Sequence, residues 1–320
     1  MIVDLLPSEQ QQLIEDSIRG VLAARLPVSR LREAASHGAA AERAAWDSLA
    51  ELGLFGLGVA EARGGLGLGA AEEALAARAL GRHLVSPAVL AQMLAPHVAD
   101  DDGLRDALIA GDVRAAFCNA EGAILQLIDS EEARYGLLLG DGIGLIDLPT
   151  ITSQIACLDE TIAMGRGAGA LLGTPRSIEA DRASLLFAAY LVGIAQAALD
   201  MAVDYASTRE QFGQPIGAFQ AIKHICADMA VRAAAAESQV FHAAITFAAG
   251  VDDRAEVAAA RLLAGDAALA NAKANLQIHG GMGFTAECDA HLYLKRAHVV
   301  SVLGSSRRAE QGRLLAGAIL

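Results

Sequence analysis

The chain has 320 residues, which is enough to fold as two or three units around a large common core. Hydrophobic residues make up 54% and aromatic residues only 4%, which favours closely packed Ala/Leu-rich helices over an aromatic-rich sandwich or barrel. The net charge of −13, without any dense Lys/Arg run, argues against binding to nucleic acid or to an anionic membrane.

The N-terminus and the cysteines indicate the compartment. The stretch from Met1 to Leu6 has no basic flank and no long apolar core, so we expect no signal peptide and a cytoplasmic protein. The four cysteines are widely spaced and form no Cys-x-x-Cys pair. We therefore expect buried free thiols rather than a zinc site or a disulfide framework.

Helical signals fill the first third of the chain, which we assign to an N-terminal helical domain over residues 1–111. Ser8, followed three positions later by Gln11, predicts a capping-box start for the first helix. Two further helices are predicted at Trp46 to Leu54 and Ala70 to Leu84, with a glycine-rich loop between them at Gly64 to Gly69. Pro87 and Pro96 are predicted to break the chain after them.

The composition changes after the acidic stretch Asp100 to Asp102, and short apolar runs follow. Asp141-Gly142 is a hairpin turn signal between two of these runs. We therefore predict a short β-rich middle domain over residues 112–178. Its strands are predicted at Arg114 to Cys118, Ala123 to Ile128, Leu137 to Leu139 and Ile143 to Ile146.

Helical periodicity returns at about Glu179 and continues to the end of the chain, which predicts a C-terminal four-helix bundle over residues 179–320. The apolar run from Ala183 to Leu199 is short for a membrane span and contains polar residues, so we expect a buried helix. The four predicted helices are Ala183 to Thr208, Phe219 to Ala249, Ala255 to Ile278 and Asp289 to Leu320.

Two polar motifs flank these helices. Arg209 precedes the turn Gly213-Gln214-Pro215, where its guanidinium could hold a diphosphate, although basic residues are also common at helix C-termini. Gly280-Gly281 follows Gln277 and could equally be an ordinary helix stop. Each motif alone is weak evidence for a site.

Together the two motifs resemble the flavin-contacting signature of the acyl-CoA dehydrogenase family. The matching segments run from Tyr205 to Gln220 and from Gln277 to Gly283, and Glu51 to Leu57 with Arg63 to Gly67 resemble the family's N-terminal helical domain. The resemblance covers most of the chain and is weak in the middle. It implies a helical domain, a small β domain and a four-helix bundle.

The resemblance also implies an FAD shared between two subunits. In that family the flavin ring lies against the β domain of one subunit, and the diphosphate and adenine reach the bundle of its neighbour. The positions that match this neighbour-facing half are Arg209, Gln211, Phe212, Gln277, Gly280 and Gly281, and the resemblance puts Ile216, Phe219 and Ile222 near the adenine.

The catalytic carboxylate that the family's chemistry requires is missing from this sequence. Proton abstraction next to a thioester needs a positioned base, and the two family positions for it fall on Gly304 and Ala183. We therefore predict no catalytic residue. A small slip in alignment would bring Asp181 or Glu179 to the second position, where an acid at a helix start is also common. A relocated base could be Asp181 or Asp228, whereas His279 and His298 are expected to be packed or solvated side chains.

The middle domain departs from the family in its flavin-ring half. The expected Thr-Glu-Pro-type turn is replaced by Phe117 to Ala123, and no tryptophan follows. The sequence therefore predicts the non-catalytic subunit of a heteromeric α2β2-type enzyme acting on a bulky acyl-CoA, such as a steroid side-chain thioester. Its partners would be a longer catalytic subunit and an electron acceptor such as electron-transfer flavoprotein. Two alternatives are a homo-oligomer with a relocated base and a flavin-free helical scaffold or acyl-binding protein.

Overall fold

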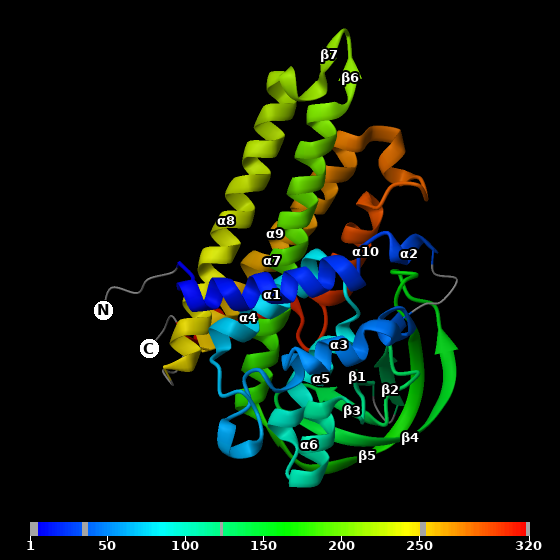
Figure 1. Cartoon of the computed structure of the whole chain (residues 1–320), viewed down its shortest axis with the longest axis vertical. Helices are drawn as coiled ribbons and strands as arrows, with labels where there is room; N and C mark the ends of the chain where they lie inside the picture. Colours follow the sequence, from blue (N-terminus) through cyan, green and yellow to red (C-terminus); the bar gives the residue numbers. More distant parts are fainter. Residues whose placement is uncertain (1–5, 34–37, 122–123, 250–253, 318–320) are drawn as a thin grey trace.

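The computed structural model describes residues 6–33, 38–121, 124–249 and 254–317. A helical N-terminal region and a C-terminal helical bundle are joined by a closed five-stranded β-barrel (Figure 1). The predicted mainly helical fold with a small β-rich middle domain is confirmed.

The N-terminal region begins as its capping signal predicts. Ser8 accepts a hydrogen bond from the Gln11 amide, and the Gln11 side chain returns one to the Ser8 amide. The predicted break at Pro96 is wrong, because this proline stands near the end of a helix that Ser86 caps and Pro87 opens. The helices are α1 Glu9–Arg25, α2 Arg30–Glu33, α3 Trp46–Glu51, α4 Ala70–Arg82, α5 Pro87–Val98 and α6 Asp102–Ala110.

The barrel has the strand order β1-β2-β5-β4-β3 and is closed by a parallel pairing of β1 with β3, while its other pairs are antiparallel. Alternate residues of β1 face two cores: Phe117 packs against the helices and Cys118 against the small barrel interior. The sequence analysis missed β5. The strands are β1 Ala115–Glu121, β2 Ile124–Ile128, β3 Tyr135–Leu139, β4 Ile143–Ile155 and β5 Met164–Arg176.

The bundle is built on three long helices, α7 Ser177–Thr208, α8 Gln220–Ala248 and α9 Arg254–His279. The predicted single segment from Asp289 to Leu320 is instead two helices, α10 Ala290–Ser301 and α11 Arg307–Gly317; residues 318–320 lie outside the described part of the chain. Gly304 separates them with a φ of +76°, which an L side chain rarely adopts and a helix cannot accommodate.

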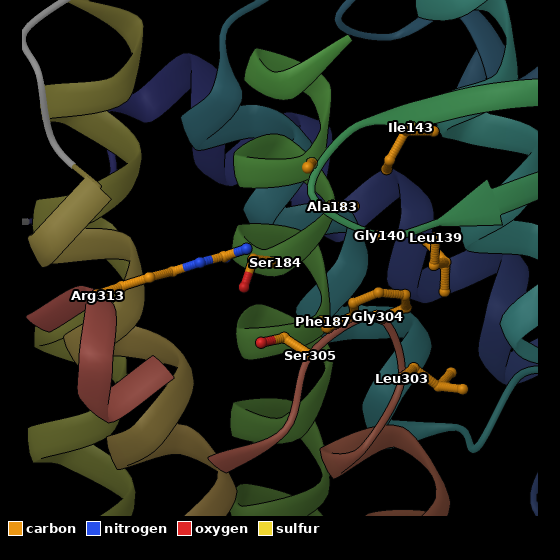
Figure 2. A pocket seen from close by; sticks show the side chains of 11 residues that line it. Leu139, Gly140, Ile143, Ala183, Ser184, Phe187, Leu303, Gly304, Ser305 and Arg313 are labelled. Atoms are coloured by element: carbon orange, nitrogen blue, oxygen red, sulfur yellow. The ribbon is translucent and has the colours of Figure 1, made fainter. Parts of the chain in front are cut away.

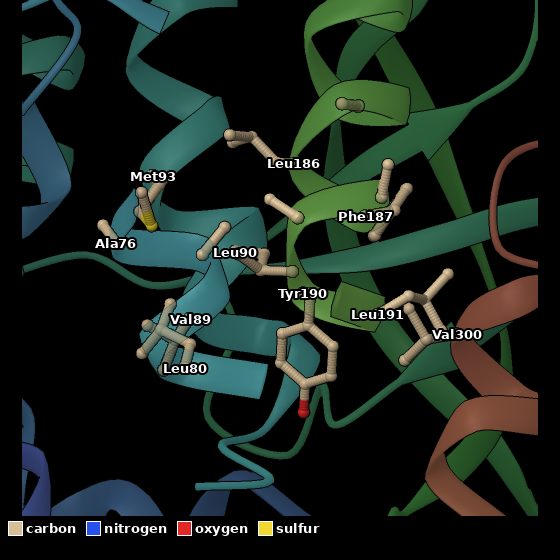
Figure 3. Packing of buried hydrophobic residues seen from close by; sticks show 14 of the residues in the cluster. Ala76, Leu80, Val89, Leu90, Met93, Leu186, Phe187, Tyr190, Leu191 and Val300 are labelled. Atoms are coloured by element: carbon tan, nitrogen blue, oxygen red, sulfur yellow. The ribbon is translucent and has the colours of Figure 1, made fainter. Parts of the chain in front are cut away.

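Helix α7 is the centre of the molecule. It is long and apolar enough to cross a membrane by length and composition, but 67% of its most apolar stretch is buried inside the protein. Gly81 of α4 and Gly193 of α7 let the two backbones cross closely, since a Cβ on Gly81 would lie 2.0 Å from the Tyr190 carbonyl oxygen. Side chains of α4, α5, α7 and α10 fill the space between these helices (Figure 3).

A buried arginine joins the three regions. Arg296 of α10 is 1% exposed and donates to Asp159 Oδ2 at 2.6 Å and Thr161 Oγ1 at 2.8 Å in the barrel. The same guanidinium donates to the Val85 carbonyl at 2.9 Å and the Tyr190 hydroxyl at 2.9 Å. Asp159 is equally buried, so this ion pair is shielded from water.

Candidate functional site

The first motif forms a hairpin at the tip of the bundle. Arg209 ends α7, and the short strands β6 Glu210–Gln211 and β7 Gln214–Pro215 project beyond it, at the top of Figure 1. Phe212 has a φ of +54° and is 93% exposed. Its ring meets Phe219 edge-on, with centroids 6.1 Å apart. An exposed aromatic ring on a strained backbone indicates a surface that contacts another molecule.

The second motif lies at the same end of the bundle. The ring of His279 stacks on Tyr205 at 4.1 Å between centroids, which joins the end of α9 to the end of α7. A small apolar cluster that includes Ile216, Ile222 and Ile278 supports this end from within. All eight sequence-predicted cofactor residues therefore belong to the hairpin and the adjoining ends of α7, α8 and α9.

The exposed tip suits the diphosphate end of a dinucleotide. Within the described part of the chain Arg209 is exposed and forms no ion pair, so its guanidinium is available for phosphate oxygens. A Cβ built on Gly213, Gly280 or Gly281 would meet no atom within 4 Å, so a ligand can approach the backbone there.

The two expected base positions come together at the other end of α7. Ala183 and Gly304 line one small pocket, together with Leu139, Gly140, Phe187 and Leu303 (Figure 2). Its volume of about 10 Å³ is the space of one water molecule. The polar side chains that line it are those of Ser184, Ser305 and Arg313, and no carboxylate is among them.

The other candidate acids lie outside this pocket. Asp181 lies 3.5 Å from Arg254, and Glu179 accepts from Arg182 at 2.7 Å. Asp228 is exposed on α8. Among these residues, and the half-buried His298, none lines the pocket, and His279 belongs to the bundle tip.

The sequence analysis missed the polar residues around this pocket. Ser184 contacts Glu310 of α11 at 3.4 Å, and Arg313 reaches from α11 toward the same helix α7 (Figure 2). These residues are far apart in sequence and match no motif. Only the packing of α11 on α9 brings them together.

The two ends of the site are far apart. Ala183 and Arg209 are separated by 26 residues of α7 and its cap, or about 39 Å at 1.5 Å per residue. A single FAD molecule does not span this distance. One chain therefore cannot apply its bundle tip and its own pocket to the same cofactor.

The N- and C-terminal regions match known families. Residues 8–100 match the family profile "Acyl-CoA dehydrogenase, N-terminal domain" and residues 177–307 match "Acyl-CoA dehydrogenase, C-terminal domain". The β-barrel between them lies outside both matches, in agreement with the weak resemblance of the middle segment.

Related proteins and structures cover the whole chain. It is 31% identical to acyl-CoA dehydrogenase IpdE2 of Mycobacterium tuberculosis over 96% of this chain and 97% of the relative. It is 36% identical to FadE34 of the same organism over 83% of this chain, but the match spans only 41% of FadE34. The ChsE4–ChsE5 complex of Mycobacterium tuberculosis has the same fold, with a TM-score of 0.80 at 19% identity over 99% of both chains. The Tcur3481–Tcur3483 steroid ACAD gives 0.80 at 21% identity over 98% of this chain and 99% of the other. The chain belongs to the acyl-CoA dehydrogenase family.

Proposed function

We propose that this chain is a non-catalytic subunit of a heteromeric FAD-dependent acyl-CoA dehydrogenase. It would supply the diphosphate and adenine half of a shared FAD site to a longer catalytic subunit, in a cytoplasmic α2β2 assembly with one FAD per unlike pair. One observation carries the proposal: Ala183 and Gly304 meet in one small pocket, and no carboxylate of the described residues lines it. The exposed bundle tip stands about 39 Å away along α7.

The chain's own residues would bind and orient the cofactor. When bound, FAD supplies the acceptor for a hydride from the β carbon of an acyl thioester. Arg209 would hold the diphosphate with charge-assisted hydrogen bonds, and Gln211 and Gln277 add polar contacts. Ile216, Phe219 and Phe212 offer the apolar and aromatic surface that an adenine ring needs.

The named relatives support the choice of partner and substrate. One structural neighbour is a complex of two named proteins, ChsE4 and ChsE5, and another is called a steroid ACAD. A bulky substrate such as a steroid side-chain thioester would fit an assembly in which only the catalytic partner subunit has an acyl-binding site. The reduced flavin would pass its electrons to an acceptor such as electron-transfer flavoprotein.

Purification of the chain alone and with its companion tests the proposal. We expect the chain alone to be colourless and inactive with acyl-CoA, and the co-expressed complex to carry one FAD per unlike pair. A chain that by itself retains FAD and dehydrogenates an acyl-CoA would overturn the proposal.

Substitution of Arg209 tests the cofactor role. In the co-expressed complex Arg209→Ala should weaken FAD binding about tenfold to a hundredfold, because a hydrogen bond to a charged group is lost. The control Arg308→Ala removes an exposed arginine on α11, distant from the tip in sequence, and should leave FAD content unchanged. Equal FAD content in both variants would favour a flavin-free scaffold.

A further inference from the structure

Two buried charged side chains lie beside the pocket between Ala183 and Gly304. Arg261 of α9 is 4% exposed and donates through Nη2 to the carbonyls of Val300 at 2.6 Å and Leu303 at 3.0 Å. Its guanidinium carbon stands 5.0 Å from the centroid of the Phe187 ring. Arg261 thus holds the last carbonyls of α10 and the start of the turn at residues 302–306.

Glu310 of α11 approaches the same place from the other end of the turn. It is 1% exposed, and its Oε1 lies 3.4 Å from Ser184 Oγ and 3.5 Å from Arg313. Two long contacts are a weak solvation shell for a buried carboxylate. Glu310 therefore needs further hydrogen-bond donors.

Three buried polar atoms here lack a hydrogen-bond partner among the described residues: Arg261 Nη1, Glu310 Oε2 and Ser305 Oγ. Arg261 also forms no ion pair within the described ranges. Burial lowers the pKa of Arg261 to about 10, while the charge of Glu310 acts to raise it, so the two charges interact without touching. Buried atoms of this kind are nearly always satisfied in native proteins.

The pocket lies beside these atoms. Ser305 lines it, together with Phe187 and Leu303, two of the residues that Arg261 contacts, whereas Arg261 and Glu310 are not among its lining residues. A buried water takes about two to four polar partners. The three unsatisfied atoms include two donors and a carboxylate acceptor, which together complement a water molecule.

We propose that Arg261, Glu310 and Ser305 form a latch, closed by one buried water that bridges the three side chains. The latch ties α9 to α11 and holds the turn at residues 302–306 over the pocket between Ala183 and Gly304. The turn beside the pocket is therefore held by polar contacts as well as by apolar packing. This inference does not depend on the cofactor or on the partner subunit.

Hydrogen exchange of the full chain, followed by mass spectrometry, tests the latch. Glu310→Gln and Arg261→Met should each speed exchange of the amides in residues 302–306 about tenfold, because the turn opens locally. Asp266→Asn is the matched control, since it breaks the exposed Arg307–Asp266 ion pair between the same two helices. The control should exchange at the parent rate in this turn.

Two results would overturn the latch. Parent-like exchange in Glu310→Gln, which is isosteric and keeps the fold testable if Arg261→Met does not fold, would show that the turn closes without it. A high-resolution crystal structure should show a water within hydrogen-bond distance of Arg261, Glu310 and Ser305. A direct Arg261–Glu310 contact there would exclude the bridging water.

Discussion

Asp129 makes the stability of this protein depend on pH. This carboxyl, in the turn after β2, is 2% exposed, accepts from the Ala163 amide at 2.7 Å and accepts a short hydrogen bond from the Ser86 hydroxyl. Burial raises the pKa of Asp129 to about 7 and Glu42 adds to the rise, while Ser86, Arg296 and the Ala163 amide oppose it. The protonated form of Asp129 is therefore part of the native contact between the barrel and the helices.

The size and sign of the effect follow from this pKa. An aspartate in the unfolded chain has a pKa near 3.9, so the difference of about 3 units corresponds to ~4 kcal/mol. The native state keeps a proton that the unfolded chain has released. The contribution of Asp129 to the free energy of unfolding is fully present below about pH 4 and is lost as the pH rises through about 7.

Urea unfolding of the parent and of Asp129→Asn across about pH 5 to pH 8 measures this term. Over that range the free energy of unfolding of the parent should fall by about 2–3 kcal/mol relative to that of the variant, because the asparagine is neutral throughout. Asp228→Asn, which removes an exposed carboxylate on α8, serves as the control and should follow the parent. An identical pH slope for Asp129→Asn and the parent would refute the assignment.

Three further substitutions test the packing and the pocket. Arg296→Met leaves the Asp159 carboxylate buried without its cation, so urea unfolding should show a free energy of unfolding lower by about 3–5 kcal/mol. A decrease below about 1 kcal/mol would contradict the structural role of the buried Arg296–Asp159 ion pair. Gly81→Ala should lower the free energy of unfolding by about 1–3 kcal/mol, because the new Cβ would collide with α7 where α4 crosses it. Gly20→Ala, whose Cβ would meet no atom, should raise the free energy of unfolding by about 0.5–1 kcal/mol. Thermal melts that rank the two variants otherwise would contradict the close α4–α7 crossing. Gly304→Glu should lower the free energy of unfolding by about 1–3 kcal/mol, because residue 304 has a positive φ. The variant should give the isolated chain no dehydrogenase activity, and measurable turnover would show that the pocket can open to a substrate.

Local signals predicted the helical parts of the fold well. The Ser8 capping box and the long periodic stretches of α7, α8 and α9 are decided by neighbours in sequence, so their existence and type can be derived from the chain alone. The strand β5 could not be predicted this way. It contains four glycines and a proline, which disfavour strands, and only its pairing with β2 and β4 makes it one.

The same division applies to the site. Motif spacing selected Arg209 and Gln277, which the fold places at one end of the bundle, and it placed the base positions at Ala183 and Gly304, which share one pocket. Nothing local marks Arg261, Glu310 or Arg296, because a buried charge is recognised only by the partners that folding brings to it. Sequence therefore identified what the family has in common, and packing revealed what is particular to this chain.

The separation of the two site halves explains how a subunit can have one without the other. The bundle tip rests on its own small apolar cluster around Met229 and Ile278, whereas the pocket belongs to the main core that contains Phe187 and Leu303. Substitutions at distant sites without shared partners act nearly independently. We therefore expect changes in the pocket between Ala183 and Gly304 to leave the geometry at Arg209 undisturbed. Because about 39 Å along α7 separates the halves, a cofactor held at this tip does not reach this chain's own pocket.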